Sequence, residues 1–214
     1  VAEFVINKGF TVQYGDTDSV YISCPDEIYA DCDREYETTM AQLAIEYAGV
    51  PIEPEPTTVE SAEYKKKRLA PRIKWWEAQV SLTMKVMAGL KEEVSDFLLA
   101  NNGTCFLNMA YEEVGFPTIF CGKKKYFLTA HIENINFYPK EIFIRGIDII
   151  KQGQAKISKQ LGEEFMREAI SPENERELLD IAEDKVRKFY KTKLDPALFA
   201  LSAKYKPNKK FHSM

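Results

Sequence analysis

The fold of this chain is decided by the stretch Tyr14-Gly15-Asp16-Thr17-Asp18-Ser19. It lies between two runs of extended character, residues 10–12 and 20–22, and the pattern predicts a β-hairpin over residues 10–24. Because side chains alternate across a strand, Asp16 and Asp18 are expected to point in roughly the same direction. Gly15 is expected to supply the sharp bend that exposes both carboxylates, since glycine adopts backbone angles that other residues avoid.

Two carboxylates that converge on one point offer hard oxygen ligands for Mg²⁺, which binds through one or two carboxylates together with substrate phosphates. This arrangement is typical of two-metal phosphoryl or nucleotidyl transfer. An Asp-x-Asp pair by itself is weak evidence, because such pairs are more often solvated turn residues. The six residues together, with the motifs further along the chain, are much more specific.

A second motif is basic and reads Gly122-Lys123-Lys124-Lys125-Tyr126. On a strand that follows the turn at Gly122, Lys124 and Tyr126 face one side while Lys123 and Lys125 face the other. One side can then meet a phosphate while the other forms salt bridges or stays hydrated. Lysines contact phosphates as point charges, which positions a nucleic acid without sequence preference. Alone, the motif is more often a solvated strand end.

Composition restricts the classes of function. The chain has 214 residues and a net charge of −4, so any contact with nucleic acid must come from local basic patches. The basic run at residues 65–68 is interpreted first as a solvated surface and second as a phosphate-facing patch. The four cysteines lack zinc-ligand spacing, which favours free thiols in a reducing compartment. The presence of only two histidines disfavours Ser-His-Asp or Cys-His catalysis.

The pattern of elements predicts an α+β region up to about residue 150, followed only by helices. The Pro- and Glu-rich residues 51–56 are expected to form a loop. Pro117 is expected either in an edge strand or at the start of a strand. Helices are expected before Gly9, over 26–48, over 76–100 with a cap at Asn102-Gly103, over 154–170, and from Ser171 and Asp195 onward. Strands are expected over 107–111, 116–121, 123–130 and 142–150.

The carboxylate stretch resembles the Tyr-Gly-Asp-Thr-Asp-Ser motif of family B DNA polymerases, and the basic motif resembles the Lys-Lys-x-Tyr element of the same family. Two further stretches are similar to segments of this family and occur in the same order along the chain. Their sequences resemble those of polymerases of large DNA viruses. These stretches are Tyr111-Glu112-Glu113-Val114-Gly115-Phe116-Pro117 and Arg145-Gly146-Ile147-Asp148-Ile149-Ile150-Lys151. The resemblance covers about residues 1–160 well and the helical remainder loosely.

The resemblance implies a polymerase palm β-sheet with packed helices over residues 1–150, with an insertion at about 25–70, and a partial all-helical thumb over 151–214. It implies template-directed DNA synthesis in which the primer 3′ hydroxyl attacks a deoxynucleoside triphosphate by a two-metal mechanism with Mg²⁺. Asp18 is the expected direct metal ligand and Asp16 tunes the site or binds metal indirectly. The implied supporting residues of the motif are Tyr14, Gly15, Thr17 and Ser19.

The same resemblance implies that Lys123, Lys124, Lys125 and Tyr126 hold the primer–template duplex. The expected partners are primer–template DNA and deoxynucleoside triphosphates, with a processivity factor as a further candidate and no membrane. The expected location is the nucleus or a viral replication compartment. The family's upstream Asp-x-x-Ser-Leu-Tyr-Pro motif, which supplies a further catalytic carboxylate, does not occur in these residues. We therefore expect a fragment that is inert alone and active within a longer parent chain.

Two alternatives remain open. Metal-dependent glycosyltransferases also use Asp-x-Asp, but their chemistry does not need the lysine-tyrosine motif. The other alternative is a catalytically inactive polymerase-like module that grips duplex DNA. The presence of Asp16 and Asp18 argues against this second alternative. We expect these like charges to be buried, and burial of charged groups lowers stability, so a module without catalysis would not be expected to retain them.

Overall fold

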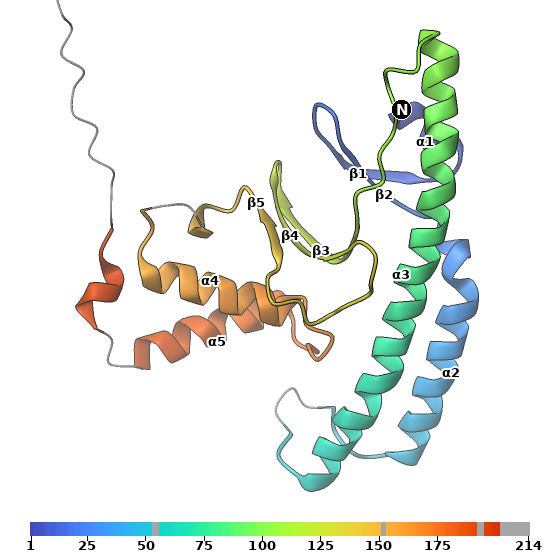
Figure 1. Ribbon diagram of the computed structural model, residues 1–214. Helices are drawn as coiled ribbons and strands as arrows, with labels where there is room; N and C mark the ends of the chain where they lie inside the picture. Colours follow the sequence, from blue (N-terminus) through green and yellow to red (C-terminus); the bar gives the residue numbers. More distant parts are fainter. Residues whose placement is uncertain (53–55, 151–152, 192–194, 202–214) are drawn as a thin grey trace, which may run out of the picture. The chain divides into compact units, whose positions relative to one another are not determined.

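The computed structural model describes residues 1–52, 56–150, 153–191 and 195–201 (Figure 1). The chain divides into two compact units, and β3 and β4 each contribute residues to both. Unit 1 comprises Val1–Phe116 with Ala130–Phe137, and unit 2 comprises Pro117–Thr129 with the described residues from Tyr138 on. The architecture is mixed, with helices and small antiparallel sheets, in agreement with the predicted α+β class.

Unit 1 begins with the elements that hold the carboxylate motif. The predicted hairpin is confirmed, and the predicted helices at the chain start and over 26–48 are also present. Gly9 follows the first helix with a φ of +90°, a backbone conformation that favours glycine. The elements are α1 (Ala2–Asn7), β1 (Thr11–Gly15), β2 (Val20–Ser23), the 3₁₀ turn η1 (Asp26–Tyr29), α2 (Ala30–Glu46) and α3 (Val59–Asn102) (Figure 1).

Helix α3 is longer than the sequence indicates. It begins at Val59 rather than near residue 76, so Pro71 and the basic run both lie inside it. The start is specified by a capping box, in which Thr58 and Ser61 exchange side-chain and backbone hydrogen bonds of 3.0 Å. The predicted cap at the other end is confirmed, since Gly103 is left-handed and its N–H donates to the Leu99 carbonyl at 2.8 Å.

The hairpin of unit 1 is anchored on the second half of α3. Val5 of α1, with Leu90 and Val94 of α3, forms a buried apolar cluster. Val12 of β1 and Ile22 of β2 pack against that cluster. Burial of these side chains fixes one end of the hairpin on the long helix and leaves the loop between the strands at the other end.

Helix α2 lies along the first half of α3 (Figure 1). The Tyr36 ring stacks on Trp75 with centroids 4.3 Å apart, and Trp75 Nε1 donates to Asp33 Oδ1 at 2.6 Å. Lys67, which belongs to the basic run, forms an ion pair with Glu46, with 2.7 Å between Lys67 Nζ and Glu46 Oε1. The α2–α3 pair therefore has its own polar and aromatic interface.

One three-stranded antiparallel sheet carries the basic motif. Its order is β3-β4-β5, so β3 with Pro117 is an edge strand as predicted. The central strand is almost inaccessible, with Phe127 1% and Leu128 0% exposed. The expected strand over 142–150 is shortened, since Asp148–Ile150 forms the 3₁₀ turn η2. The strands are β3 (Val114–Gly122), β4 (Lys125–His131) and β5 (Phe143–Arg145).

The strand predicted over residues 107–111 does not form. The alternating apolar side chains of Leu107, Met109 and Tyr111 suggested it. In the structure the Met109 N–H donates to Ser95 Oγ of α3 at 3.1 Å, so this backbone group bonds to a helix side chain instead of a neighbouring strand. Met109 and Tyr111 pack against apolar clusters that include α3 residues, whereas Leu107 is exposed.

The described residues after Gly153 contain only helical elements and turns. Phe127 packs with Met166 and Ile170 in the core of unit 2. Ser171 does not begin a helix as predicted, because its Oγ accepts the Glu173 N–H at 3.3 Å within a turn. The predicted start at Asp195 is confirmed for a short 3₁₀ turn, where Asp195 Oδ1 accepts the Ala197 N–H at 2.9 Å. The elements are α4 (Lys156–Ala169), α5 (Leu178–Lys191) and η3 (Pro196–Phe199).

Among the described residues, no helix is both long enough and apolar enough to cross a membrane. The chain passes between the compact units after Phe116, after Thr129 and after Phe137. The assignment of a palm, an insertion and a thumb stays a prediction.

Candidate functional site

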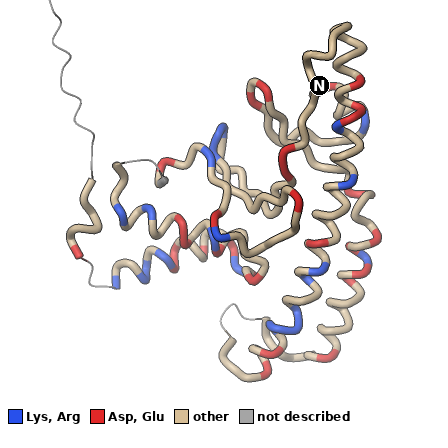
Figure 2. Tube along the Cα trace, in the orientation of Figure 1, with Lys and Arg blue, Asp and Glu red and all other residues tan. Residues whose placement is uncertain are grey.

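The two aspartates lie in a loop rather than on a strand. Gly15 and Val20 are the last paired residues of the hairpin, and residues 16–19 connect them. We call these four residues, which are all exposed, the carboxylate loop. The strand alternation from which a common direction of Asp16 and Asp18 was expected therefore does not apply to these residues. The tube of this hairpin tip is coloured red for its acidic residues in Figure 2.

Hydrogen bonds within the carboxylate loop define its shape. The Asp16 N–H donates to the Ser19 carbonyl at 3.0 Å, which closes the loop. Thr17 Oγ1 approaches Asp16 Oδ1 at 3.4 Å. A loop of this size turns the chain without requiring a glycine conformation, and it holds Asp16 and Asp18 together at the hairpin tip.

Gly15 does not have the role predicted for it. Its φ lies outside the left-handed region, and it pairs with Val20 as part of β1. A Cβ added there would come no closer than 3.8 Å to the Ser19 carbonyl oxygen, an ordinary van der Waals contact. The bend comes from the four-residue loop instead, so the expectation for Gly15 is wrong.

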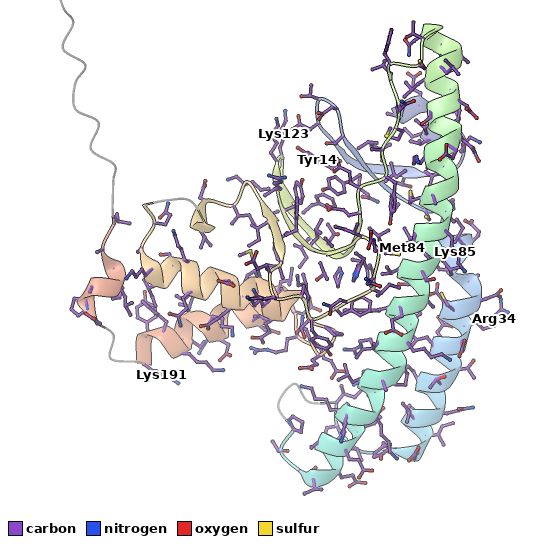
Figure 3. The ribbon with its side chains drawn as sticks, in the orientation of Figure 1. Tyr14, Arg34, Met84, Lys85, Lys123 and Lys191 are labelled. Atoms are coloured by element: carbon purple, nitrogen blue, oxygen red, sulfur yellow. The ribbon has the colours of Figure 1, made fainter. Side chains whose placement is uncertain are left out.

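A β-bulge lies at the base of the loop. Val12 pairs with Ile22 and Tyr14 pairs with Tyr21, so Gln13 is an extra residue on β1. Bulges of this kind increase strand twist and re-aim the side chains beyond them, and they are frequent beside active sites. The Tyr14 and Tyr21 rings are 6.2 Å apart and tilted by 34°. Figure 3 labels Tyr14 on this hairpin.

Glu113 is a carboxylate that the sequence motif did not connect to this hairpin. The Tyr21 hydroxyl donates to Glu113 Oε1 at 3.4 Å across 92 residues of sequence. The acidic stretch around Glu113 was visible in the sequence, but only the fold brings it to β2. Sequence separation hides such a contact, since no periodicity links the two positions.

The carboxylate loop suits a hard cation but does not enclose one. Two exposed carboxylates leave room for water and phosphate oxygens, as Mg²⁺ sites with substrate phosphates require. Within the described ranges, no group of three or more His, Cys, Asp or Glu side chains is placed to hold a metal ion. The Mg²⁺ prediction therefore rests on the donor type of Asp16 and Asp18.

The basic motif forms a turn at the other hairpin. β3 ends at Gly122 and β4 begins at Lys125, so Lys123 and Lys124 connect them. We call these two residues the lysine turn. The expectation that they alternate on a strand is wrong. Figure 3 labels Lys123 at this tip, and Figure 2 shows the tip as basic.

Lys124 has an unusual backbone. Its φ is +59°, and it is the one non-glycine residue with positive φ in the part of the chain that the structure describes. A residue with a Cβ pays a steric penalty of about 1–2 kcal/mol in the left-handed region. Outliers of this kind are concentrated at functional sites, where surrounding structure holds them.

Lys125 and Tyr126 support the lysine turn from its base. Lys125 Nζ lies 3.6 Å from Asp148 Oδ2. Tyr126 is only 8% exposed, and its ring lies 6.2 Å from that of Phe143. The strand register pairs Tyr126 with Arg145, whose guanidinium is 4.9 Å from the Phe143 ring centroid. The Tyr126 ring is thus part of the packing beneath the turn.

The other basic residues favour the simpler interpretation. Lys67 and Lys74 of α3 form ion pairs with Glu46 and Glu35 of α2, as expected for a solvated charged surface. The C-terminal lysines, for which the sequence leaves open DNA contact or a solvated tail, lie outside the described residues. They are Lys204, Lys206, Lys209 and Lys210.

The structure brings the predicted site residues together in two groups. Asp16 and Asp18, with Tyr14, Gly15, Thr17 and Ser19, belong to the hairpin of unit 1. Lys123, Lys124, Lys125 and Tyr126 belong to unit 2. Each group is complete within its own unit.

Comparison with known proteins finds curated relatives, whereas no family model and no solved structure matches. Proteins named DNA polymerase beta, from African swine fever virus isolates Tick/Malawi/Lil 20-1/1983 and Pig/Kenya/KEN-50/1950, are 42% identical over 179 residues. The alignment covers 82% of this chain but only 13% of each relative. The name of these relatives does not confirm family B. The chain is therefore similar to a short segment of viral enzymes named as DNA polymerases, as the sequence resemblance had indicated.

Proposed function

We propose that this chain contributes the carboxylate loop and the lysine turn to a family B DNA polymerase within a longer polypeptide. The 42% identity to viral proteins named DNA polymerase, over 13% of their length, supports the enzyme class and the segment role. The motifs at Tyr14–Ser19 and Gly122–Tyr126 support family B. In this proposal residues 1–150 are palm, with an insertion near 25–70, and residues 151–214 are the start of the thumb.

The exposed pair Asp16 and Asp18, held at the tip of a hairpin packed on α3, is the observation that carries this proposal. Asp18 binds Mg²⁺ directly, and Asp16 acts through the loop or through water. When bound there, the metal stabilises the charge on the attacking and leaving oxygens of nucleotidyl transfer. Thr17 lies between the two carboxylates and leaves room for the primer end.

The lysine turn holds the duplex. Lys123 and Lys124 contact phosphates of the primer–template as point charges, which positions the DNA without reading its sequence. Lys125 and Tyr126 fix the base of the turn through Asp148 and Phe143. The substrates are primer–template DNA and deoxynucleoside triphosphates, the location is a nuclear or viral replication compartment, and a processivity factor is a further candidate partner.

Primer extension by the longer polypeptide, as wild type and as Asp18→Asn, tests the proposal. The variant is expected to lose extension while it keeps affinity for primer–template DNA, because only the metal ligand changes. Asp31→Asn is a matched control, since Asp31 is also an exposed carboxylate but lies in α2. Unchanged extension by Asp18→Asn would contradict the assigned role. The 214-residue chain alone is expected to give no extension.

An inactive module that grips duplex DNA is the second candidate. This hypothesis is retained because Asp16 and Asp18 are exposed. Exposed carboxylates keep most of their hydration, so a module without catalysis could retain them at little cost in stability. This candidate predicts that DNA binding depends on the lysine turn and that extension is absent even in the longer polypeptide.

A further inference from the structure

Gly146 makes a close backbone approach to the lysine turn. It follows β5 directly and has a φ of +66°. A Cβ built on Gly146 would lie 1.7 Å from the Lys124 carbonyl oxygen and 2.8 Å from the Lys124 carbonyl carbon. Both contacts are with backbone atoms, which cannot rotate aside as a side chain does. Any other residue at this position therefore requires the backbone to move.

The strands beside this contact cannot take up the movement. Phe127 and Leu128 are buried and are paired with Ile144 and Phe143 of β5, which fixes the two strands against each other. Tyr126 is paired with Arg145 immediately before Gly146. The lysine turn, in contrast, is the end of a hairpin. A side chain at position 146 would thus displace Lys124 rather than the sheet.

From this contact we propose that Gly146 is a positioning residue for the lysine turn. The absence of a side chain lets the backbone at Gly146 lie against the Lys124 carbonyl, and this contact keeps Lys124 in its left-handed conformation. The conformation fixes the direction in which Lys123 and Lys124 leave the hairpin toward phosphates of duplex DNA. This inference rests on the proposed DNA-binding function of the turn and adds a residue that does not itself contact DNA.

The test measures binding of the 214-residue chain to a fluorescein-labelled primer–template duplex, by anisotropy over a range of salt concentrations. Lys124→Ala serves as the reference, because loss of one phosphate contact reduces the salt slope by about 0.9. Gly146→Ala is expected to weaken binding at least as much as Lys124→Ala and to reduce the slope by a similar amount, although it removes no charge.

Gly162→Ala is the matched control for general destabilisation of unit 2. A Cβ at Gly162 would lie 2.6 Å from Ile149 Cγ2, so it also creates a clash, but with a side chain and not with the backbone of the lysine turn. Binding by this variant is expected to stay within about twofold of wild type at temperatures where it is folded. Gly49→Ala controls for positive φ alone, since Gly49 has a φ of +86° and no atom within 4 Å of the added Cβ.

The outcomes separate this inference from the proposed function. If Lys124→Ala binds as tightly as wild type, the DNA-binding function of the turn is wrong. If Lys124→Ala is weakened while Gly146→Ala binds normally, or no more weakly than Gly162→Ala, only the positioning inference is wrong. If Gly146→Ala does not fold, NMR of the wild-type chain decides: a fixed positive φ at Lys124 supports the inference, and a φ averaged over conformations overturns it.

Discussion

The two hairpins present opposite charges by different backbone means. The carboxylate loop spans four residues, keeps ordinary backbone angles and leaves Asp16 and Asp18 exposed. The lysine turn spans two residues and places Lys124 in a left-handed conformation against Gly146. The red and blue tips in Figure 2 show the opposite charges of the two hairpins. Hydrogen bonds within the loop shape the carboxylate loop, whereas the lysine turn lies against the backbone of another segment at Gly146.

The largest effect is expected within the carboxylate loop. In the longer polypeptide, Asp18→Asn should slow primer extension by about 100-fold or more, comparable to the loss of a preorganised electrostatic group. Asp16→Asn should slow it less, because Asp16 is proposed to act indirectly. Single-turnover extension rates measure both variants. If Asp16→Asn slows extension more than Asp18→Asn does, Asp16 rather than Asp18 is the direct metal ligand.

A double substitution in the lysine turn tests the effect of charge on DNA binding and the effect of backbone conformation on stability. Replacing Lys123 and Lys124 by Asn-Gly removes two cations and places glycine, which adopts positive φ without a steric penalty, at position 124. The double variant should bind duplex DNA with a salt slope reduced by about 1.8. Its free energy of unfolding should rise by about 1 kcal/mol through relief of the Lys124 strain. Anisotropy and thermal unfolding measure the two effects, and weaker binding with unchanged stability would show that Lys124 is not strained.

The next largest effect is a pH dependence of stability caused by His131, which lies at the opposite end of β4 from the lysine turn. Burial lowers the pKa of His131 below its ordinary value of 6.5, while the bond to the Phe116 carbonyl, 2.7 Å from Nε2, opposes this lowering. The unfolded chain binds the proton more tightly, so the free energy of unfolding is greatest above pH 6.5. It should decrease as the pH falls from 6.5 toward the lower folded pKa, with a limiting slope of about 1.4 kcal/mol per pH unit. Unfolding curves of His131→Gln, measured over the same pH range, should lack this decrease.

The smallest effect is expected at Gly15. Because its φ is not left-handed and an added Cβ has space, Gly15→Ala should change the free energy of unfolding by no more than about 0.5 kcal/mol. Thermal unfolding of Gly15→Ala and Gly146→Ala compares the two hairpins directly. A large loss for Gly15→Ala would show that the carboxylate loop is under backbone strain after all.

Local patterns predicted a good part of the fold. The hairpin around Asp16 and Asp18, the cap at Gly103 and the edge position of Pro117 follow from residue preferences that act over a few positions. The helix over 154–170 follows from its periodicity. The strand predicted around Met109 does not form because a more distant partner, Ser95 of α3, accepts the Met109 N–H. The missed start of α3 and the turn at Ser171 depend on local hydrogen bonds between Thr58 and Ser61 and between Ser171 and Glu173.

The sequence by itself determined which chemical groups this chain offers, namely paired carboxylates in one motif and clustered ammonium groups in another. It also determined that each would lie near a turn, because glycine and the flanking extended runs act locally. Only the tertiary structure decided that Lys124 is left-handed, that Gly146 lies against its carbonyl, and that Tyr21 reaches Glu113. These contacts join residues far apart in the chain, and close packing of the folded backbone alone brings them together.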